Sequence, residues 1–143
     1  MKPVHILLIE DNEGDILLTI EAFEELSIAH KISVARDGDE AIDYLEHRSR
    51  KKADELPDLI LLDINLPKKN GFEILSHIKG SDSLRHLPVI IMTTSSSDKD
   101  IFQSYQNYAN CYITKPIDVG DFMKVIAALE NFWIKIVKLP GRN

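Results

Sequence analysis

Short runs of branched apolar residues alternate along the chain with longer segments of helical spacing, and this alternation limits the possible folds more than any other feature. Four of the runs are continuous and predict strands that are buried on both faces. They lie at residues 4–9, 59–62, 89–92 and 111–113. A fifth run, at residues 31–35, alternates Ile32 and Val34 with polar residues, which predicts an edge strand with one wetter face.

The segments between these runs repeat apolar residues every three or four positions, as amphipathic helices do. Ile16, Ile20 and Phe23, which follow the first run, are an example. Strands that alternate with helices form a parallel sheet, because each helical crossover returns the chain to the same end of the sheet. The sequence therefore predicts an α/β fold, a doubly wound five-stranded parallel sheet with helices on both faces.

The last helical segment is longer than the closure of one small sheet requires. Its apolar stripe continues to Ile136, and we expect the helix to extend to about residue 139 because Pro140 follows. Two adjacent aromatic residues near its end, Phe132 and Trp133, leave two interpretations open. Either both close the core, or at least one faces outward on a surface for self-association.

Composition excludes several classes of protein. With 17 basic against 23 acidic residues the formal net charge is -6, so we expect no direct binding to nucleic acid. The single cysteine excludes an internal disulfide framework and a cysteine-based zinc site. The first apolar run meets Glu10 and Asp11 too soon for a signal peptide or a membrane span. We therefore expect one cytoplasmic domain over residues 1–143 that does not bind a membrane. The middle of the polar segment 47–57 is expected to form an exposed connection after the second helical segment.

Polar side chains follow four of the five predicted strands where the strands end. Glu10 and Asp11 follow the first strand, Asp63 follows the third, Thr93 ends the fourth, and Lys115 follows the fifth. In a doubly wound sheet the carboxyl ends of the strands meet at one edge, where ligands bind. We therefore expect these five side chains to converge.

Converging carboxylates repel one another unless a cation compensates them. A hard divalent cation such as Mg²⁺ prefers carboxylate oxygens and water as ligands, and a carboxylate beside it can attack phosphorus while Lys115 adds positive charge. Taken singly, Glu10, Asp11 or Asp63 is more often a helix cap or a solvated turn residue. Their combination with Thr93 and Lys115 favours a site that accepts a phosphoryl group.

The residues at this edge resemble those of a known family, the receiver domains of two-component response regulators. The resemblance covers about residues 4–130 and rests on four motifs: LLIEDN with the acidic pair, DINLPKKNG around Asp63, IIMTTS with Thr93 and YITKP with Lys115. It implies a flavodoxin-like fold with strand order 2-1-3-4-5, a core within residues 4–130 that an extended C-terminal helix follows, and no effector domain.

The resemblance also implies roles for the acidic residues. Asp63 would accept a phosphoryl group from the phosphohistidine of a sensor histidine kinase. Glu10, Asp11, Asp63 and the backbone carbonyl of Asn65 would hold Mg²⁺ or Mn²⁺. The protein would then be a phosphoacceptor switch and not an enzyme, since it would assist only its own phosphorylation and dephosphorylation.

The remaining implied roles concern the transmission of the signal. Thr93 would bond a phosphoryl oxygen, Lys115 would pair with the phosphoryl group, and Tyr112 would rotate inward as the switch turns on. A cis peptide bond between Lys115 and Pro116 would shape the loop. The output would be a changed surface, and we expect a homodimer through the face formed by the fourth helix, the fifth strand and the fifth helix.

The chain resembles one branch of the family more closely, the small regulators that accompany cyanobacterial phytochromes. The polar insertion near RSRKKADELP and the ending NFWIKIVKLP carry this resemblance, which implies a phytochrome as the upstream kinase. Two residues depart from the commonest receiver pattern. Thr94 stands where a smaller residue is usual and is expected to narrow access to Asp63, and Glu10 stands where many members have Asp, a longer arm that should still reach the metal.

Two other functions stay open. A metal-dependent phosphatase with an aspartate nucleophile has a DxD motif whose second Asp transfers a proton, but here that position is Asn65, whose amide is a poor proton carrier. A receiver-like module that binds partners without phosphate usually lacks an acidic residue or the lysine, and this chain keeps all of them.

Overall fold

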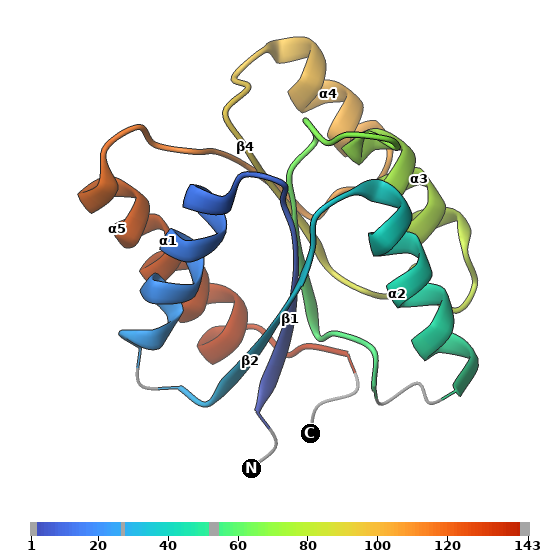
Figure 1. The fold of residues 1–143 in the computed structure, drawn as a ribbon, viewed down its shortest axis with the longest axis horizontal. Coiled ribbons are helices and arrows are strands. Elements are labelled where there is room, and N and C mark those ends of the chain that lie inside the picture. The colour runs from blue at the N-terminus through green and yellow to red at the C-terminus, as the bar shows by residue number, and fades with distance from the viewer. Residues whose placement is uncertain (1–2, 27, 52–54, 141–143) are drawn as a thin grey trace.

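A computed structural model describes residues 3–26, 28–51 and 55–140. Within these residues, five strands form one parallel sheet in the order β2-β1-β3-β4-β5 (Figure 1). The strands are β1 Val4–Ile9, β2 His30–Ala35, β3 Leu59–Leu62, β4 Val89–Thr93 and β5 Cys111–Thr114. The predicted fold class and strand order are confirmed, and β2 lies at an edge of the sheet as its alternating pattern predicted. β5 lies at the other edge and is only partly buried, so the prediction of a fully buried strand is wrong for β5.

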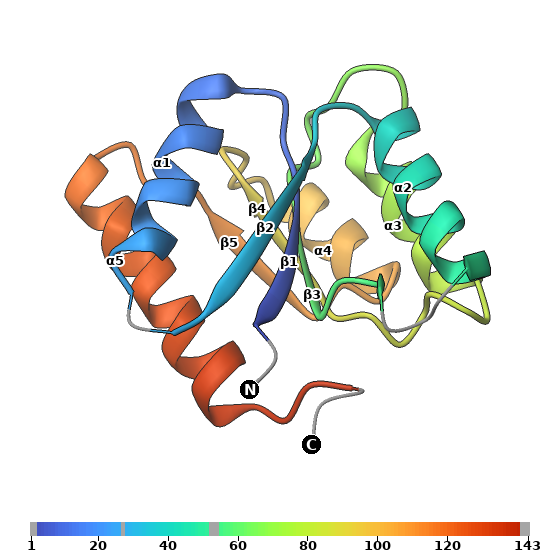
Figure 2. The same cartoon turned by 60° about the horizontal axis from the view of Figure 1, so that its bottom comes forward.

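Helices cover both faces of the sheet, with α1 and α5 on one face and α2, α3 and α4 on the other (Figures 1 and 2). Their bounds are α1 Glu13–Glu24, α2 Gly38–Lys51, α3 Gly71–Gly80, α4 Asp98–Gln106 and α5 Val119–Leu129. The polar segment 47–57 begins inside α2, and its middle, residues 52–54, for which we predicted an exposed connection, lies outside the described residues. None of the described helices is long and apolar enough to span a bilayer.

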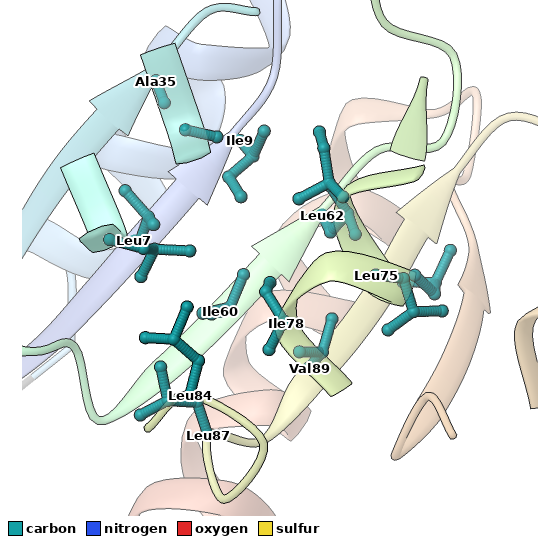
Figure 3. Packing of buried hydrophobic residues seen from close by; sticks show 14 of the residues in the cluster. Leu7, Ile9, Ala35, Ile60, Leu62, Leu75, Ile78, Leu84, Leu87 and Val89 are labelled. Atoms are coloured by element: carbon teal, nitrogen blue, oxygen red, sulfur yellow. The ribbon is translucent and has the colours of Figure 1, made fainter. Parts of the chain in front are cut away.

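The central strands carry unbroken apolar sequence because both of their faces are buried. Successive side chains of a strand point to opposite faces. In β1, Leu7 and Ile9 therefore pack in the cluster beneath α2 and α3, part of which Figure 3 shows, whereas Ile6 and Leu8 pack in the cluster beneath α1 and α5. Because all five strands are parallel, the residues that follow them lie at the same edge of the sheet.

The five α-helices of the described residues begin at the carboxyl edge of the sheet with a capped first turn. In α2, Asp37 Oδ1 accepts the Glu40 N–H at 2.8 Å. Asn12, Asn70, Ser97 and Asp118 are the N-cap residues of α1, α3, α4 and α5, and each side chain accepts a backbone N–H of the first turn. An N-cap bond satisfies one of the N–H groups that a helix start leaves without an intrahelical partner. The caps thereby define where each loop of this edge ends.

The helical path after α5 differs from the prediction. Residues Glu130–Ile136 (η2) wind as a π-helix, and the path ends there and does not reach residue 139. Val137 is extended, with φ -72° and ψ 141°, and its N–H donates to the Phe132 carbonyl at 2.8 Å. Leu139, two residues further along this extended segment, has a buried side chain.

The two aromatic residues of this segment have different environments. Trp133 packs against the cluster beneath α1 and α5, whereas Phe132 is 52% exposed. Phe132 therefore faces outward, which excludes the interpretation that both aromatic residues close the core, and its use for self-association stays a prediction.

The predicted cis peptide bond between Lys115 and Pro116 is wrong for this structure, because the described residues contain no cis peptide bond. Even before proline the trans form is more stable, by about 0.5–1 kcal/mol. In the trans form, the Lys115 backbone N–H donates to the Thr93 carbonyl at 2.6 Å and extends the pairing of β4 with β5.

Candidate functional site

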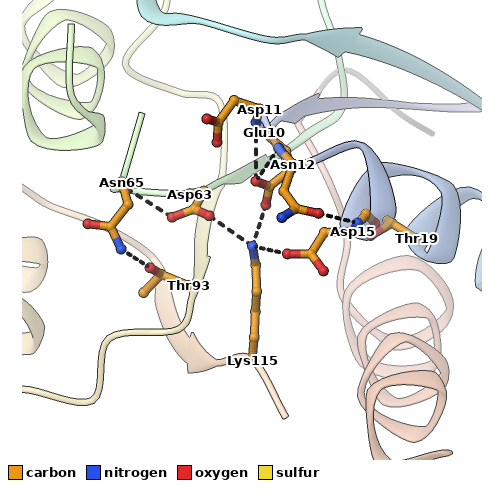
Figure 4. Close-up of polar contacts among 9 residues, drawn as sticks. All are labelled: Glu10, Asp11, Asn12, Asp15, Thr19, Asp63, Asn65, Thr93 and Lys115. Carbon is orange, nitrogen blue, oxygen red and sulfur yellow. Dashed lines mark hydrogen bonds and ion pairs between the residues drawn. The ribbon is translucent and has the colours of Figure 1, made fainter. Parts of the chain in front are cut away.

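The polar residues that follow the strands meet at the carboxyl edge of the sheet, as predicted (Figure 4). Parallel pairing continues past the strands and sets their relative positions. The Asp63 N–H donates to the Ile9 carbonyl at 3.0 Å, which aligns the end of β3 with the end of β1. Glu10, Asp63 and Lys115 are each more than nine-tenths buried, so their charges lie largely outside the reach of bulk water.

Lys115 occupies the centre of the site. Its ammonium Nζ lies 2.8 Å from Asp63 Oδ2 and 2.9 Å from Asp15 Oδ2, and it also donates to Glu10 Oε2. One ammonium thus faces three carboxylates. Because Coulomb interactions are stronger in a buried site than in water, the excess negative charge is a strong electrostatic feature of this edge.

The pKa values of the buried pair reflect this arrangement. Burial, together with the nearby charge of Asp63, raises the pKa of Glu10 to about 7, although the bond from Lys115 acts in the opposite direction. Burial alone would lower the pKa of Lys115. The bonds to Asp63, Glu10 and Asp15 outweigh that effect and hold the pKa of Lys115 above its usual value, so the lysine stays charged.

The acidic pair at the end of β1 is split between two environments. Glu10 is buried, and its second oxygen, Oε1, accepts the backbone N–H groups of Asp11 and Asn12, each at 3.1 Å. The Asp11 side chain is exposed and has no hydrogen bond or ion pair with a described residue. Among the described residues, no group of three or more His, Cys, Asp or Glu is arranged so that it could hold a metal ion. The predicted ligands share one edge, but Lys115 lies between two of them.

Thr93 and Asn65 form the side of the site opposite Glu10 (Figure 4). The Asn65 backbone N–H donates to Asp63 Oδ1 at 2.9 Å, and its side-chain Nδ2 donates to Thr93 Oγ1 at 3.3 Å. Thr93 is fully buried, whereas Thr94 is exposed. Asp63 therefore has one oxygen held by Lys115 and the other by Asn65.

Tyr112 is connected to this site through the segment after β4. Its hydroxyl donates to the Ser95 carbonyl at 2.8 Å, and its ring packs partly buried against the cluster beneath α2 and α3. Its backbone N–H donates to the Tyr105 hydroxyl of α4 at 3.2 Å. Tyr112 thus contacts both the loop that follows Thr93 and the helix that this loop enters.

The turn after Asp63 is held close to its neighbours. A Cβ atom on Gly71 would overlap the Ile64 Cα, so only glycine fits behind the acidic residue. Lys68, at φ 65°, pairs with Asp37 at 3.4 Å, and Lys69 pairs with Asp39 at 3.3 Å. These two exposed pairs connect the turn to the region where α2 begins.

Asp15 is a residue of this site that the sequence analysis missed. It lies in the first turn of α1, and its carboxylate reaches the same ammonium as Asp63. An acidic residue in the first turn is common because it interacts favourably with the helix dipole, so the sequence held no distinct signal for it.

A parallel sheet whose carboxyl edge gathers acidic residues, a threonine and a buried lysine defines a class of signalling domains. The chain belongs to the response regulator receiver domain family, whose model matches residues 6–127. It is therefore a receiver-domain phosphoacceptor of two-component signalling, and such domains are typically not enzymes in the ordinary sense.

Particular relatives are similar over nearly the whole chain. Response regulator Rcp1 of Synechocystis sp. is 39% identical over 139 residues, which is 97% of this chain and 95% of that protein. The probable methanogenesis regulatory protein FilR2 of Methanothrix harundinacea is 40% identical over 140 residues, 97% of this chain and 89% of that protein.

Solved structures show the same similarity. The phosphorylated cyanobacterial phytochrome response regulator RcpA superposes with a TM-score of 0.90 at 40% identity, covering 98% of this chain and 100% of that one. The Mn²⁺-bound form of Rcp1 also gives 0.90, at 39% identity, covering 97% and 100%. The resemblance to phytochrome-associated regulators is thus confirmed at the level of sequence and fold.

Proposed function

We propose that Asp63 is the residue that accepts the phosphoryl group, and that the donor is a phosphohistidine of a sensor histidine kinase. The observation that carries this proposal is the position of the Asp63 carboxylate, with Lys115 Nζ at 2.8 Å from one oxygen and the Asn65 N–H at 2.9 Å from the other. A carboxylate oxygen attacks phosphorus, an O–P bond forms, and the N–P bond to the imidazole breaks. Lys115 offsets charge on the transferring group.

The residues fit a divalent cation by the chemistry of their donor atoms. Glu10, Asp11 and Asp63 supply carboxylate oxygens and Asn65 a backbone carbonyl, which are the ligands that Mg²⁺ and Mn²⁺ prefer. Three carboxylates, those of Glu10, Asp15 and Asp63, face the single ammonium of Lys115, so the site has room for a further positive charge. When bound, the cation would neutralise charge on the phosphoryl oxygens. The Mn²⁺-bound form of the relative Rcp1 supports this assignment.

The signal would leave the site through Thr93 and Tyr112. A phosphoryl group brings more negative charge and more acceptor oxygens than the carboxylate it replaces. Thr93 Oγ1, now bonded to Asn65, would donate to a phosphoryl oxygen, and the loop after Thr93 would move with it. Since Ser95 in that loop accepts the Tyr112 hydroxyl, Tyr112 would change position in turn.

The changed surface would lie on α4, β5 and α5, where we place a homodimer contact. Exposed apolar side chains supply the support: Phe102 and Tyr105 of α4 are 65% and 48% exposed, and Val119 at the start of α5 is 59% exposed. Exposed apolar groups of this kind often mark protein contacts. A twofold pair would bury the same patch on both copies.

The names of the relatives support a phytochrome as the upstream kinase. RcpA is described as a phytochrome response regulator, and its structure is that of a phosphorylated form. Because the similarity covers 98% of this chain, including the segment after residue 127 that the family model does not match, we extend the phytochrome pathway to this chain.

Phosphorylation by acetyl phosphate tests the central assignment. The wild-type chain and Asp63→Asn would be incubated with acetyl phosphate, with and without Mg²⁺, and separated on a phosphate-affinity gel. We expect a shifted band that requires Mg²⁺ and is absent in Asp63→Asn. A shifted band in both proteins would move the acceptor elsewhere. No uptake in either would favour the phosphorylation-independent binding module, and sustained release of phosphate over many turnovers would favour the phosphatase.

A further inference from the structure

Asp15 occupies the third side of the Lys115 ammonium, and none of the roles given above uses it. An ammonium group has three N–H donors, and here Glu10, Asp63 and Asp15 each accept one. In the proposed function the other two carboxylates have further tasks, since Glu10 binds the cation and Asp63 binds phosphorus. Asp15 is the one partner of Lys115 to which the proposed function gives no other task.

The position of the Asp15 carboxylate is set by two bonds of its own backbone. The Asp15 N–H donates to the N-cap oxygen Asn12 Oδ1 at 2.9 Å, and the Asp15 carbonyl accepts the Thr19 hydroxyl at 2.7 Å. These two hydrogen bonds hold the backbone of Asp15 at its N–H and at its carbonyl, and the Thr19 side chain is buried. Figure 4 shows the resulting direction, with the Asp15 side chain pointing toward Lys115.

A first-turn acid that only stabilises the helix would not need this direction. Glu13 in the same turn provides the comparison, because its carboxylate pairs with Arg36 on an exposed surface at 2.5 Å. The Asp15 side chain is only 32% exposed, and its contact is with a lysine whose side chain is 6% exposed. Both acids satisfy the helix dipole, but only one of them reaches the reacting site.

We propose that Asp15 is a positioning residue for phosphoryl transfer, holding the Lys115 ammonium beside Asp63. The proposal rests on the function proposed above and deepens it. The lysine side chain is flexible and its ammonium is a compact charge, so its position depends on its anchors. Without Asp15, Lys115 shares its remaining bonds with Glu10 and Asp63 alone. A cation on Glu10 would then repel the ammonium, with no third carboxylate to keep the ammonium near phosphorus.

The test compares Asp15→Asn and Asp15→Glu with the matched control Asp121→Asn. Asp121 occupies the equivalent place in α5: it is an exposed acid of the first turn whose N–H donates to the N-cap residue, Asp118, at 3.0 Å. The measured quantity is the rate of phosphorylation by acetyl phosphate when both acetyl phosphate and Mg²⁺ are saturating. Circular dichroism and urea unfolding establish that each variant is folded.

A positioning role gives a rate about tenfold lower in Asp15→Asn, the effect expected when one charge-assisted hydrogen bond is lost from the transition state. Asp15→Glu, which keeps the charge on a longer arm, should fall between Asp15→Asn and the wild type, and Asp121→Asn should equal the wild type. If Asp15→Asn fails to fold, Asp15→Glu decides, because a charge that acts only through the helix dipole would leave its rate unchanged.

Two results would overturn the inference, and they are distinguishable. If the wild type is phosphorylated and Asp15→Asn reaches the wild-type rate at saturating Mg²⁺, Asp15 does not contribute to the rate of phosphoryl transfer. The positioning role is then refuted, and the proposed function stands. If the wild type takes up no phosphate under conditions in which Asp63→Asn also takes up none, the proposed function fails and this inference fails with it.

Discussion

The two ends of β1 bury polar side chains in opposite ways. Near the amino end, His5 Nε2 lies 2.9 Å from both the Ser33 and the Tyr44 hydroxyl oxygens, which are 3.0 Å apart, and the three groups are neutral partners of one another. At the carboxyl end, the charged Lys115 faces three carboxyl groups, those of Glu10, Asp15 and Asp63. The first arrangement joins neutral groups, whereas the second gathers three carboxyl groups around one ammonium.

The pKa shifts express the same difference. Burial, with the positive charge of Lys31 nearby, lowers the pKa of His5 below its ordinary value of 6.5 and so keeps the ring neutral. At the other end burial raises the pKa of Glu10, but the bonds to three carboxylates keep Lys115 charged. A buried network of neutral groups stabilises one structure, and a buried excess of charge makes the structure respond to what binds there.

The largest expected effect on the free energy of unfolding comes from removing the Lys115 ammonium at the carboxyl end of β1. Lys115→Met would leave Glu10 and Asp63 buried without their ammonium, and removing one partner of a buried ion pair costs about 3–5 kcal/mol of unfolding free energy. Urea unfolding without metal measures this cost, with the exposed Lys124→Met as the control. Equal stability of the two variants would contradict the view that Lys115 compensates this edge.

The second expected effect is stabilisation by metal at the charged end alone. A ligand that binds only the folded state at a hundred times its Kd adds about 2.7 kcal/mol to the unfolding free energy. We expect Mg²⁺ to produce such a gain in the wild type and in His5→Gln, and a much smaller one in Glu10→Gln. A thermal or urea titration with MgCl₂ measures it. A loss of the gain in His5→Gln would show that the two ends of β1 are not independent.

The third effect is a pH dependence that arises at the neutral end. The pKa of His5 is lowered in the folded state, so below about pH 6.5 the unfolded chain binds more protons and the unfolding free energy falls, by at most about 1.4 kcal/mol per pH unit. Stability from this group is fully present above pH 6.5. His5→Gln should lose this slope between pH 7.5 and 5.5, whereas the exposed His86→Gln should keep it. Equal slopes in all three proteins would refute the assignment to His5.

The smallest effect concerns Thr94, which is exposed next to the buried Thr93. If its side chain limits the approach of water to phosphorylated Asp63, Thr94→Ala should lose phosphate faster, by about threefold, because excluding water slows hydrolysis. The decay of the phosphorylated band after removal of acetyl phosphate measures the rate. An unchanged rate would show that Thr94 does not restrict access, and the uptake rate serves as the internal control.

Strand positions and the strand order were predictable from the sequence and the family resemblance, because buried parallel strands leave runs such as Val4–Ile9 and Leu59–Leu62 that few other structures explain. The convergence of Glu10, Asp63 and Lys115 followed from the same reasoning, since the residue after each strand must lie at the edge.

Three features of the structure could not be predicted from the sequence. Asp15 and Glu13 satisfy the same helix-dipole rule, and only tertiary packing separates the one that reaches Lys115 from the one that reaches Arg36. Over seven residues the apolar spacing of η2 does not distinguish a π-helix from an α-helix. The cis bond before Pro116 rested on resemblance alone, and the structure has trans at that position.

The π-helical end has a practical consequence for where this domain can be cut. In a π-helix the hydrogen bonds join residues five apart, which brings Lys135 Nζ to 2.8 Å from Glu130 Oε1, whereas in an α-helix the same two residues lie on different sides. Glu130 is 3% exposed, and its other oxygen has no partner among the described residues. A fragment trimmed at residue 127, where the family match stops, would lose the buried Leu129 and Leu139, and one that ends between Glu130 and Lys135 would bury an unpaired carboxylate. Fusions and truncations should therefore keep the chain through Leu139.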